Sequence, residues 1–206
     1  MIFTVAIDGP AAAGKGTIAR AVAEHFGFIY LDTGLLYRAA ARKVLDGLDP
    51  VDAALALTPR DFIRDGLRTA KVGQMASKIA AMPLVRAALI EFQHKFTRQE
   101  GGTVVDGRDI GTVICPEAEV KLFITASDEV RAHRRWLELS QKDPELKEAD
   151  VLAGQLERDK RDSERAVSPL RMAADAVLLD TSAMDIAAAV QAAIAVVEAA
   201  RGANGQ

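Results

Sequence analysis

The sequence contains little cysteine, little histidine and no excess of positive charge. Its single cysteine, Cys115, excludes an intramolecular disulfide, and the three histidines are scattered without metal-ligand or catalytic-triad spacing. A net charge of −3 argues against general nucleic-acid binding, because no basic excess exists to displace counterions. No uncharged apolar run is long enough to cross a membrane, and no signal peptide is recognisable. We therefore expect a cytoplasmic protein that binds neither nucleic acid nor membranes.

Length and composition indicate one globular unit. A chain of 206 residues can bury a full core, and 50% apolar with 27% charged residues is typical of a soluble α/β protein. No internal repeat, low-complexity tract or flexible linker divides the chain. We expect a single domain over residues 1–206, and a monomer.

The most informative stretch is a glycine-rich segment with one lysine. An apolar run at 2–7 precedes it, and Ile18, Val22 and Phe26 follow at helical spacing before Gly27. Strand, glycine-rich turn and helix form the context of a phosphate-binding loop, in which backbone N–H groups, the helix N-terminus and a lysine face an oligophosphate. The alternative, a tight turn with an incidental lysine, is disfavoured by both flanking elements. The residues expected to bind the phosphates of a nucleotide cofactor are Gly9, Pro10, Ala11, Ala12, Ala13, Gly14, Lys15, Gly16 and Thr17.

One position departs from the commonest form of this loop. Gly16, and not Ser or Thr, follows Lys15, and the hydroxyl comes one residue later at Thr17. The usual first protein ligand of Mg²⁺ is therefore missing, so we expect Mg²⁺ to be held by nucleotide phosphates and water and assign it no protein ligand.

Short apolar runs predict five strands, at residues 2–7, 28–31, 102–105, 120–125 and 176–180. We expect the first two of these strands to be buried. Helical segments separate the five strands. The predicted fold class is α/β: a five-stranded parallel sheet of the P-loop NTPase type, covered by helices on both faces.

Polar residues follow the second of these strands. Asp32 and Thr33 end it, and Tyr37 and Arg38 lie one turn further along the next helix. Because ligands bind at the carboxyl ends of parallel strands, these residues are candidates for a site. Simple helix capping by Asp32 or Thr33 is the alternative.

The third strand ends in Asp106-Gly107-Arg108-Asp109. An acidic residue at this place resembles the second acidic element of P-loop proteins, which supports the metal or its water shell. A plain β-turn is the alternative, although the charged pair after the glycine disfavours it.

Helices account for the remaining polar candidates. We expect short helices within 46–70, then helices over 71–81 and 84–99 from which Ser77 and Arg86 project. The second of these helices should bury Val85, Leu89, Phe92 and Phe96.

Arginines gather on two later helices, the first capped by Ser127, with a bend at Asp143-Pro144 between them. Such runs are usually solvated faces, but the preference for arginine over lysine favours phosphate contacts. The residues concerned are Arg131, Arg134, Arg135, Arg158, Arg161 and Arg165.

The last helix should start at a capping box formed by Ser182 and Asp185. It should dock on the sheet through Ile186, Val190, Ile194 and Val197.

Five motifs, in order and over nearly the whole chain, resemble the bacterial cytidylate kinase family. They are Ile7-Asp8-Gly9-Pro10 with its loop, Leu31-Asp32-Thr33-Gly34 with Tyr37-Arg38, Asp106-Gly107-Arg108-Asp109-Ile110-Gly111-Thr112-Val113, Arg131-Ala132-His133-Arg134-Arg135, and Arg158-Asp159-Lys160-Arg161-Asp162 with Arg165-Ala166-Val167. The resemblance implies a core (1–38, 102–130 and 166–206), a substrate-binding insertion (about 39–101) and a lid (about 131–165).

The same resemblance implies transfer of a phosphoryl group from ATP to CMP or dCMP with Mg²⁺. It assigns Thr33, Tyr37, Arg38 and Arg108 to the acceptor phosphate, Ser77, Arg86 and Asp109 to cytosine, and Arg158 and Asp162 to the sugar. It makes Arg165 a phosphate clamp, and the expected catalytic set is Lys15, Asp106, Arg108, Arg134 and Arg165.

One region departs from the family pattern, and three rival functions stay open. Residues 39–72 look short and helical where many members carry a β-rich insertion. A kinase of AMP, UMP, dTMP or a non-nucleotide would be separated by a panel of acceptors. A GTPase-like switch should carry an Asn-Lys-x-Asp motif, which is absent. A structural protein with a vestigial loop would not repeat charged candidates at four strand ends.

Overall fold

The computed structural model describes residues 2–141 and 143–204. Its centre is a sheet of five parallel strands in the order β2 (Ile29–Asp32), β3 (Thr103–Asp106), β1 (Thr4–Asp8), β4 (Val120–Thr125) and β5 (Val177–Asp180). In the register of the sheet, Asp106 lies between Asp32 of β2 and Ile7 of β1. The polar residues at the carboxyl ends of these strands therefore lie together at one end of the sheet. The predicted fold class is confirmed.

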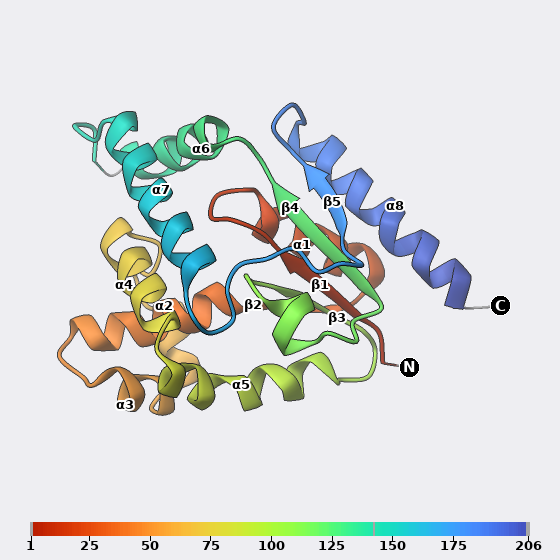
Figure 1. The fold of residues 1–206 in the computed structure, drawn as a ribbon, viewed down its shortest axis with the longest axis horizontal. Coiled ribbons are helices and arrows are strands. Elements are labelled where there is room, and N and C mark those ends of the chain that lie inside the picture. The colour runs from red at the N-terminus through yellow and green to blue at the C-terminus, as the bar shows by residue number, and fades with distance from the viewer. Residues whose placement is uncertain (1, 142, 205–206) are drawn as a thin grey trace.

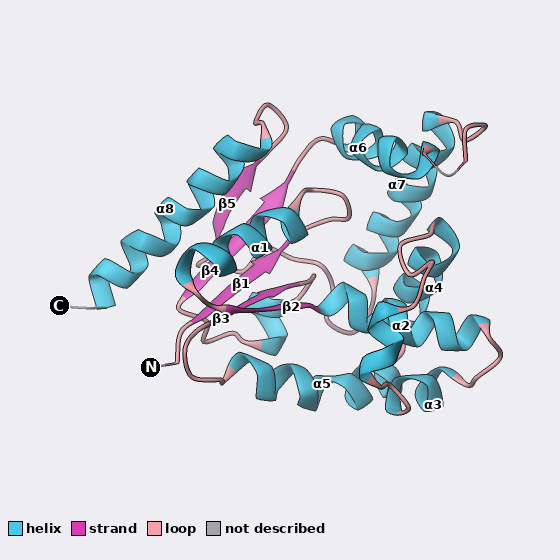
Figure 2. Ribbon diagram, turned by 180° about the vertical axis from the view of Figure 1, so that it is seen from behind, coloured by secondary structure: helices cyan, strands magenta, loops and turns pink. Residues whose placement is uncertain are grey.

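Helices cover both faces of the sheet (Figures 1 and 2). On one face, α1 (Lys15–Phe26) and α8 (Ile186–Asn204) pack against Val5, Ile7 and Leu122. On the other, α5 (Pro83–Thr97) and a π-helical turn at Ile110–Ile114 enclose Ala6 and Val105. This π-helical turn was not expected from the sequence.

The segment after β2 consists of helices joined by short turns and loops. It contains α2 (Thr33–Leu45), α3 (Pro50–Leu55), a 3₁₀-helix (Pro59–Ile63) and α4 (Ala70–Ala80). Tyr37, Ala40, Ile79 and Val85 form its own buried core, separate from the sheet. The helical character predicted for 39–72 is confirmed.

Two further helices follow β4. Ser127 caps α6 (Asp128–Ser140) by accepting a hydrogen bond from the Val130 amide, as predicted. After a bend, α7 (Glu148–Glu164) runs back beside α4, so residues far apart in the sequence meet (Figure 1).

Four local predictions were wrong. The strand β2 is not buried, because it forms an edge of the sheet, and Ile29 is 40% exposed. Phe92 projects from α5 into solvent. Ser182 does not form a capping box, since its hydroxyl donates to Asp180 while Asp185 accepts from the Ala188 amide.

The fourth correction concerns Ile186, which does not dock α8 on the sheet. It is 70% exposed because the first turn of α8 extends past the end of β5 to the rim of a cavity. The helix docks through the other three predicted residues, Val190, Ile194 and Val197, together with Ala189 and Ala193.

Gly9 is the point at which β1 enters the glycine-rich loop, and we expect Gly9→Ala to destabilise the fold. The backbone there has φ +145°, and a Cβ would lie 1.9 Å from the Ile124 carbonyl oxygen. Backbone strain and overpacking should together lower the free energy of unfolding by about 2–3 kcal/mol. Urea denaturation measures this change. Gly47→Ala is the matched control, because its φ is also positive but no atom lies within 4 Å of the new Cβ. Equal losses in the two variants would contradict the steric argument.

Candidate active site

The loop between β1 and α1 holds Lys15 in an unusual position. Positive φ values at Gly9, Ala12 and Gly14 curve the loop, and Lys15 starts α1 directly after it. The Lys15 ammonium is buried and donates to the Pro10 carbonyl at 2.7 Å, so it bends back over the loop. Loops of this shape present N–H groups and a cation to phosphate oxygens.

The charge of Lys15 is poorly compensated. Burial lowers its pKa, and the nearby Arg108 lowers it further, against a smaller opposing effect from Asp106. Burial also raises the pKa of the Asp106 carboxyl, and Asp32 adds to this rise. An anionic ligand would favour the charged lysine, because an opposite charge stabilises a buried ammonium.

Asp8 connects the loop to the segment that follows β3. Its carboxylate accepts from the Ile110 and Gly111 amides, at 2.8 Å each. Burial raises the pKa of Asp8 to about 6 despite these bonds. Asp8 therefore holds the start of the π-helical turn, directly after Asp109, against the end of β1.

The two acidic strand ends have different surroundings. Asp32 caps α2 by accepting from the Leu35 amide at 2.9 Å, and it pairs with Arg68 at 3.3 Å. Asp106 accepts from the Tyr30 hydroxyl at 3.3 Å, and its carbonyl accepts from the buried Thr33 hydroxyl at 2.7 Å. The capping interpretation thus describes Asp32, while Thr33 lies against the Asp106 segment.

A buried cluster gathers four of the predicted substrate residues. Asp109 pairs with Arg86 through one carboxylate oxygen and with Arg165 at 3.3 Å through the other. Arg86 also donates to the Tyr37 hydroxyl at 3.3 Å. These side chains come from α2, α5, the turn after β3 and the end of α7, so only the folded chain brings them together.

An adjoining cluster is centred on Asp162 of α7. Its carboxylate accepts from the Ser77 hydroxyl at 2.7 Å and from Arg108 at 3.1 Å, while Arg158 lies 3.7 Å away. Burial alone would raise the pKa of Asp162, but Arg108 and Arg158 hold it below its ordinary value. Asp162 is therefore an ionised acceptor.

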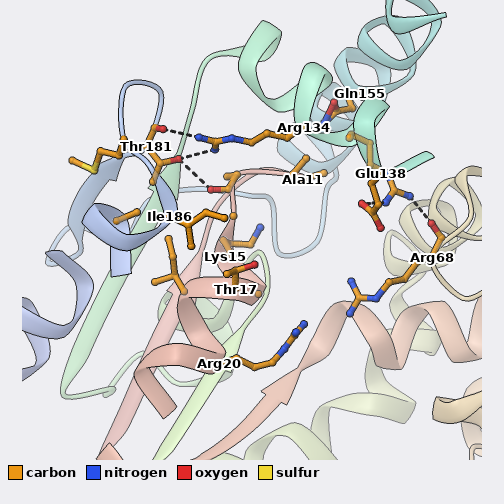
Figure 3. Close-up of a pocket in the computed structure, with 18 of the residues that line it drawn as sticks. Ala11, Lys15, Thr17, Arg20, Arg68, Arg134, Glu138, Gln155, Thr181 and Ile186 are labelled. Carbon is orange, nitrogen blue, oxygen red and sulfur yellow. Dashed lines mark hydrogen bonds and ion pairs between the residues drawn. The ribbon is translucent and has the colours of Figure 1, made fainter. Parts of the chain in front are cut away.

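A cavity of about 440 Å³ opens beside the glycine-rich loop (Figure 3). Basic side chains greatly outnumber the two acidic ones that line it, Glu138 and Asp185. This excess makes the cavity a site for polyanions. The basic residues are Lys15, Arg20, Arg38, Arg68, Arg134, Arg135 and Arg158.

Two of these cations, Arg38 and Arg158, are half-buried and lie close together. Burial lowers the pKa of Arg38 to about 9, and the neighbouring Arg158 contributes to the fall. Burial, followed by Arg108, lowers the pKa of Arg158 to about 10. Both guanidinium groups lie against α4 at Gly73, where a Cβ would stand 3.2 Å from Arg38 and 3.6 Å from Arg158. An anion between them would relieve this repulsion.

Arg134 lies at another part of the cavity, away from the two polar clusters. Its guanidinium donates to the Thr181 carbonyl at 2.8 Å and to the Thr181 hydroxyl at 3.0 Å (Figure 3). These bonds hold Arg134 at the cavity wall beside Thr181, and its catalytic role stays a prediction.

Sequence reasoning missed several cavity residues. Arg20 lies one turn after Lys15 on α1, a spacing that could have indicated it. Arg68 lies in a stretch without a clear pattern, and Gln155 is hidden in a charged helix. Thr181, Met184 and Ile186 border the cavity beyond β5, where apolar contact with a ligand becomes available (Figure 3).

Few side chains near the glycine-rich loop could bind a metal ion. In the described parts of the chain, no cluster of three or more His, Cys, Asp or Glu could hold a metal ion. A Cβ on Gly16 would lie 3.5 Å from an Asp106 carboxylate oxygen, so Asp106 adjoins the place where other loops carry a hydroxyl. The residues fit a Mg²⁺ whose ligands come mainly from phosphates and water.

Across residues 2–141 and 143–204, no helix has the length and apolarity to cross a bilayer.

Comparison with known proteins identifies the family. The protein-family model described as "Cytidylate kinase" matches residues 5–59 and 55–199 of this chain. A cytidylate kinase of Cereibacter sphaeroides (strain KD131) is 65% identical over 198 residues, which cover 96% of each chain. A cytidylate kinase of Rhodopseudomonas palustris (strain CGA009) is 53% identical over 204 residues and again covers 96% of each chain.

Solved structures support the fold alone. A gluconokinase from Sinorhizobium meliloti has a TM-score of 0.51 and 17% identity, covering 100% of this chain and 97% of that one. A protein from Eubacterium ventriosum, described as uncharacterized, reaches 0.57 with 16% identity, covering 97% and 99%. The family model and the sequence relatives span nearly the whole chain, and the chain belongs to the cytidylate kinase family.

Proposed function

We propose that the protein transfers the γ-phosphoryl group of ATP to CMP or dCMP, giving ADP and CDP or dCDP. The observation that carries this proposal is the cationic cavity beside the glycine-rich loop, in a chain that also buries an Arg86–Asp109–Arg165 cluster. Both sequence relatives reported above are named cytidylate kinase, and neither name supports a kinase of UMP.

Residues 9–17 would bind the ATP phosphates, with Lys15 stabilising charge on the transferring group. Arg134, Arg108 and Arg165 would add positive charge around the transfer path, and the apolar rim at Ile186 would face the base of ATP. The acceptor is a phosphate oxygen that is already anionic, so no strong general base is needed. Mg²⁺ would neutralise developing phosphate charge, with Asp106 supporting its water shell.

The acceptor would lie along the two polar clusters. Thr33, Tyr37, Arg38 and Arg108 would bind its phosphate, Arg158 and Asp162 its sugar, and Ser77, Arg86 and Asp109 its base. Cytosine presents an amino donor at N4 and an acceptor at N3, so a carboxylate and a guanidinium complement it, whereas uracil reverses both groups.

We also propose a division of the chain into a core, a substrate-binding insertion and a mobile lid. The core would be 1–38, 102–130 and 166–206, with an insertion at about 39–101 and a lid at about 131–165 that excludes water. We propose that the protein acts as a monomer. A cytoplasmic location would supply the ATP.

A panel of acceptors tests the function. With ATP and Mg²⁺, we expect CMP and dCMP to be phosphorylated efficiently. The kcat/KM for UMP should be lower than that for CMP by a factor of about 100 or more, because UMP would leave buried polar groups unpaired. ADP release is followed in a coupled assay with CMP, dCMP, UMP, AMP and dTMP. A higher kcat/KM for UMP, AMP or dTMP than for CMP would overturn the proposal.

A further inference from the structure

Gln74 joins the insertion to the helix α7 through both ends of its amide group. Its nitrogen donates to the Gly154 carbonyl at 3.0 Å, and its oxygen accepts from Arg161 at 3.1 Å. The carbonyl can only accept and the guanidinium can only donate, so the amide has one possible orientation. Figure 1 shows α4 and α7 side by side at this point.

Arg161 also contacts Ser77, one of the residues proposed to read the base. Its guanidinium nitrogen Nη1, which donates to Gln74, donates to the Ser77 hydroxyl oxygen at 3.1 Å as well. A guanidinium NH₂ group has two hydrogens, and these contacts use both of them. The other NH₂ group of Arg161 pairs with Glu157, which leaves the guanidinium little freedom to rotate.

Ser77 is therefore bound between a donor and an acceptor. It must accept from Arg161, and it must give its single proton to the ionised Asp162 at 2.7 Å. Ser77 is also buried, so water does not offer it another partner. Of its two lone pairs one is used, and the hydroxyl can only accept a hydrogen bond from a third group.

We propose that Arg161, held by Gln74, is a positioning residue: by donating to Ser77 it keeps the Ser77 proton on Asp162, so that Ser77 offers the base only its remaining lone pair. This inference rests on the proposed function. An acceptor at Ser77 favours an amino group, such as the one at cytosine N4, and opposes a carbonyl oxygen, such as the one at uracil O4. Arg161 and Gln74 thus belong to the machinery of base selection although they are assigned no contact with the base.

Four variants test the proposal, each assayed for kcat/KM with CMP and with UMP. Ser77→Ala should lower the value for CMP about tenfold and leave UMP unchanged or better, because a lone pair facing O4 is removed. Arg161→Met should narrow the CMP:UMP ratio about fivefold, and Gln74→Leu about twofold to threefold. Arg161→Lys keeps a donor and should preserve most of the ratio.

Gln191→Leu is the matched control, since Gln191 is exposed on α8, and it should leave the ratio unchanged. Thermal unfolding of each variant separates a loss of folded protein, which would lower both acceptors equally, from a change of selectivity. Parallel losses for CMP and UMP in Ser77→Ala, or an unchanged ratio in Arg161→Met, would overturn the inference. If the wild-type protein itself does not prefer CMP, the proposed function fails instead.

Discussion

Lys15→Ala is expected to lower kcat/KM for CMP phosphorylation by about a thousandfold or more, because the lysine charge stabilises the transferring phosphoryl group by several kcal/mol. The fold should survive the change. Burial lowers the pKa of Lys15, so its charge is disfavoured in the free protein, and removing it relieves that penalty.

Steady-state assays with varied ATP at saturating CMP measure the effect, and circular dichroism with thermal unfolding checks the fold. Lys95→Ala is the control, because Lys95 is 75% exposed and pairs with Glu91 on the surface of α5. Near-normal turnover in folded Lys15→Ala protein would contradict the assignment of the loop.

Asp109→Asn is expected to narrow the CMP:UMP ratio of kcat/KM by about 100-fold, mostly through loss of CMP activity. In the structure, both carboxylate oxygens of Asp109 face guanidinium groups, those of Arg86 and Arg165. An asparagine would turn an NH₂ group toward one arginine or toward the N4 amino group of cytosine. The same NH₂ group could donate to uracil O4, so UMP should lose much less.

The buried ion pairs also make Asp109 important for stability, since leaving a buried charge unpaired typically costs about 3–5 kcal/mol. Both acceptors must therefore be assayed on the same folded sample, at a temperature well below its unfolding midpoint. A loss of folded enzyme scales both rates equally and leaves their ratio unchanged. An unchanged ratio would thus remove Asp109 from base reading and leave it a structural role.

Local features were predictable from the sequence. The strand β4 was predicted with its observed bounds, and Gly27 and Ser127 cap the helices expected of them. Each of these depends on a few neighbouring residues, such as a β-branched run or a hydroxyl two or three residues before an unpaired amide.

Burial of particular side chains was less predictable. An apolar run has the same pattern at the edge of a sheet as at its centre, so Ile29 and Val177 were indistinguishable from Val5. Helical periodicity likewise cannot say how far a helix extends beyond the sheet that it covers, which is why Ile186 faces the cavity.

The sequence by itself determined the phosphate-binding loop, because its strand, glycines, lysine and helix are contiguous and their conformation follows from local sterics and backbone hydrogen bonding. Only the tertiary structure decided the partners of the acceptor residues. Ser77 meets Asp162 across 85 positions and Arg86 meets Asp109 across 23. Such pairs form because parallel strands align their carboxyl ends and α7 packs along α4, and no local pattern records which donor then faces which acceptor.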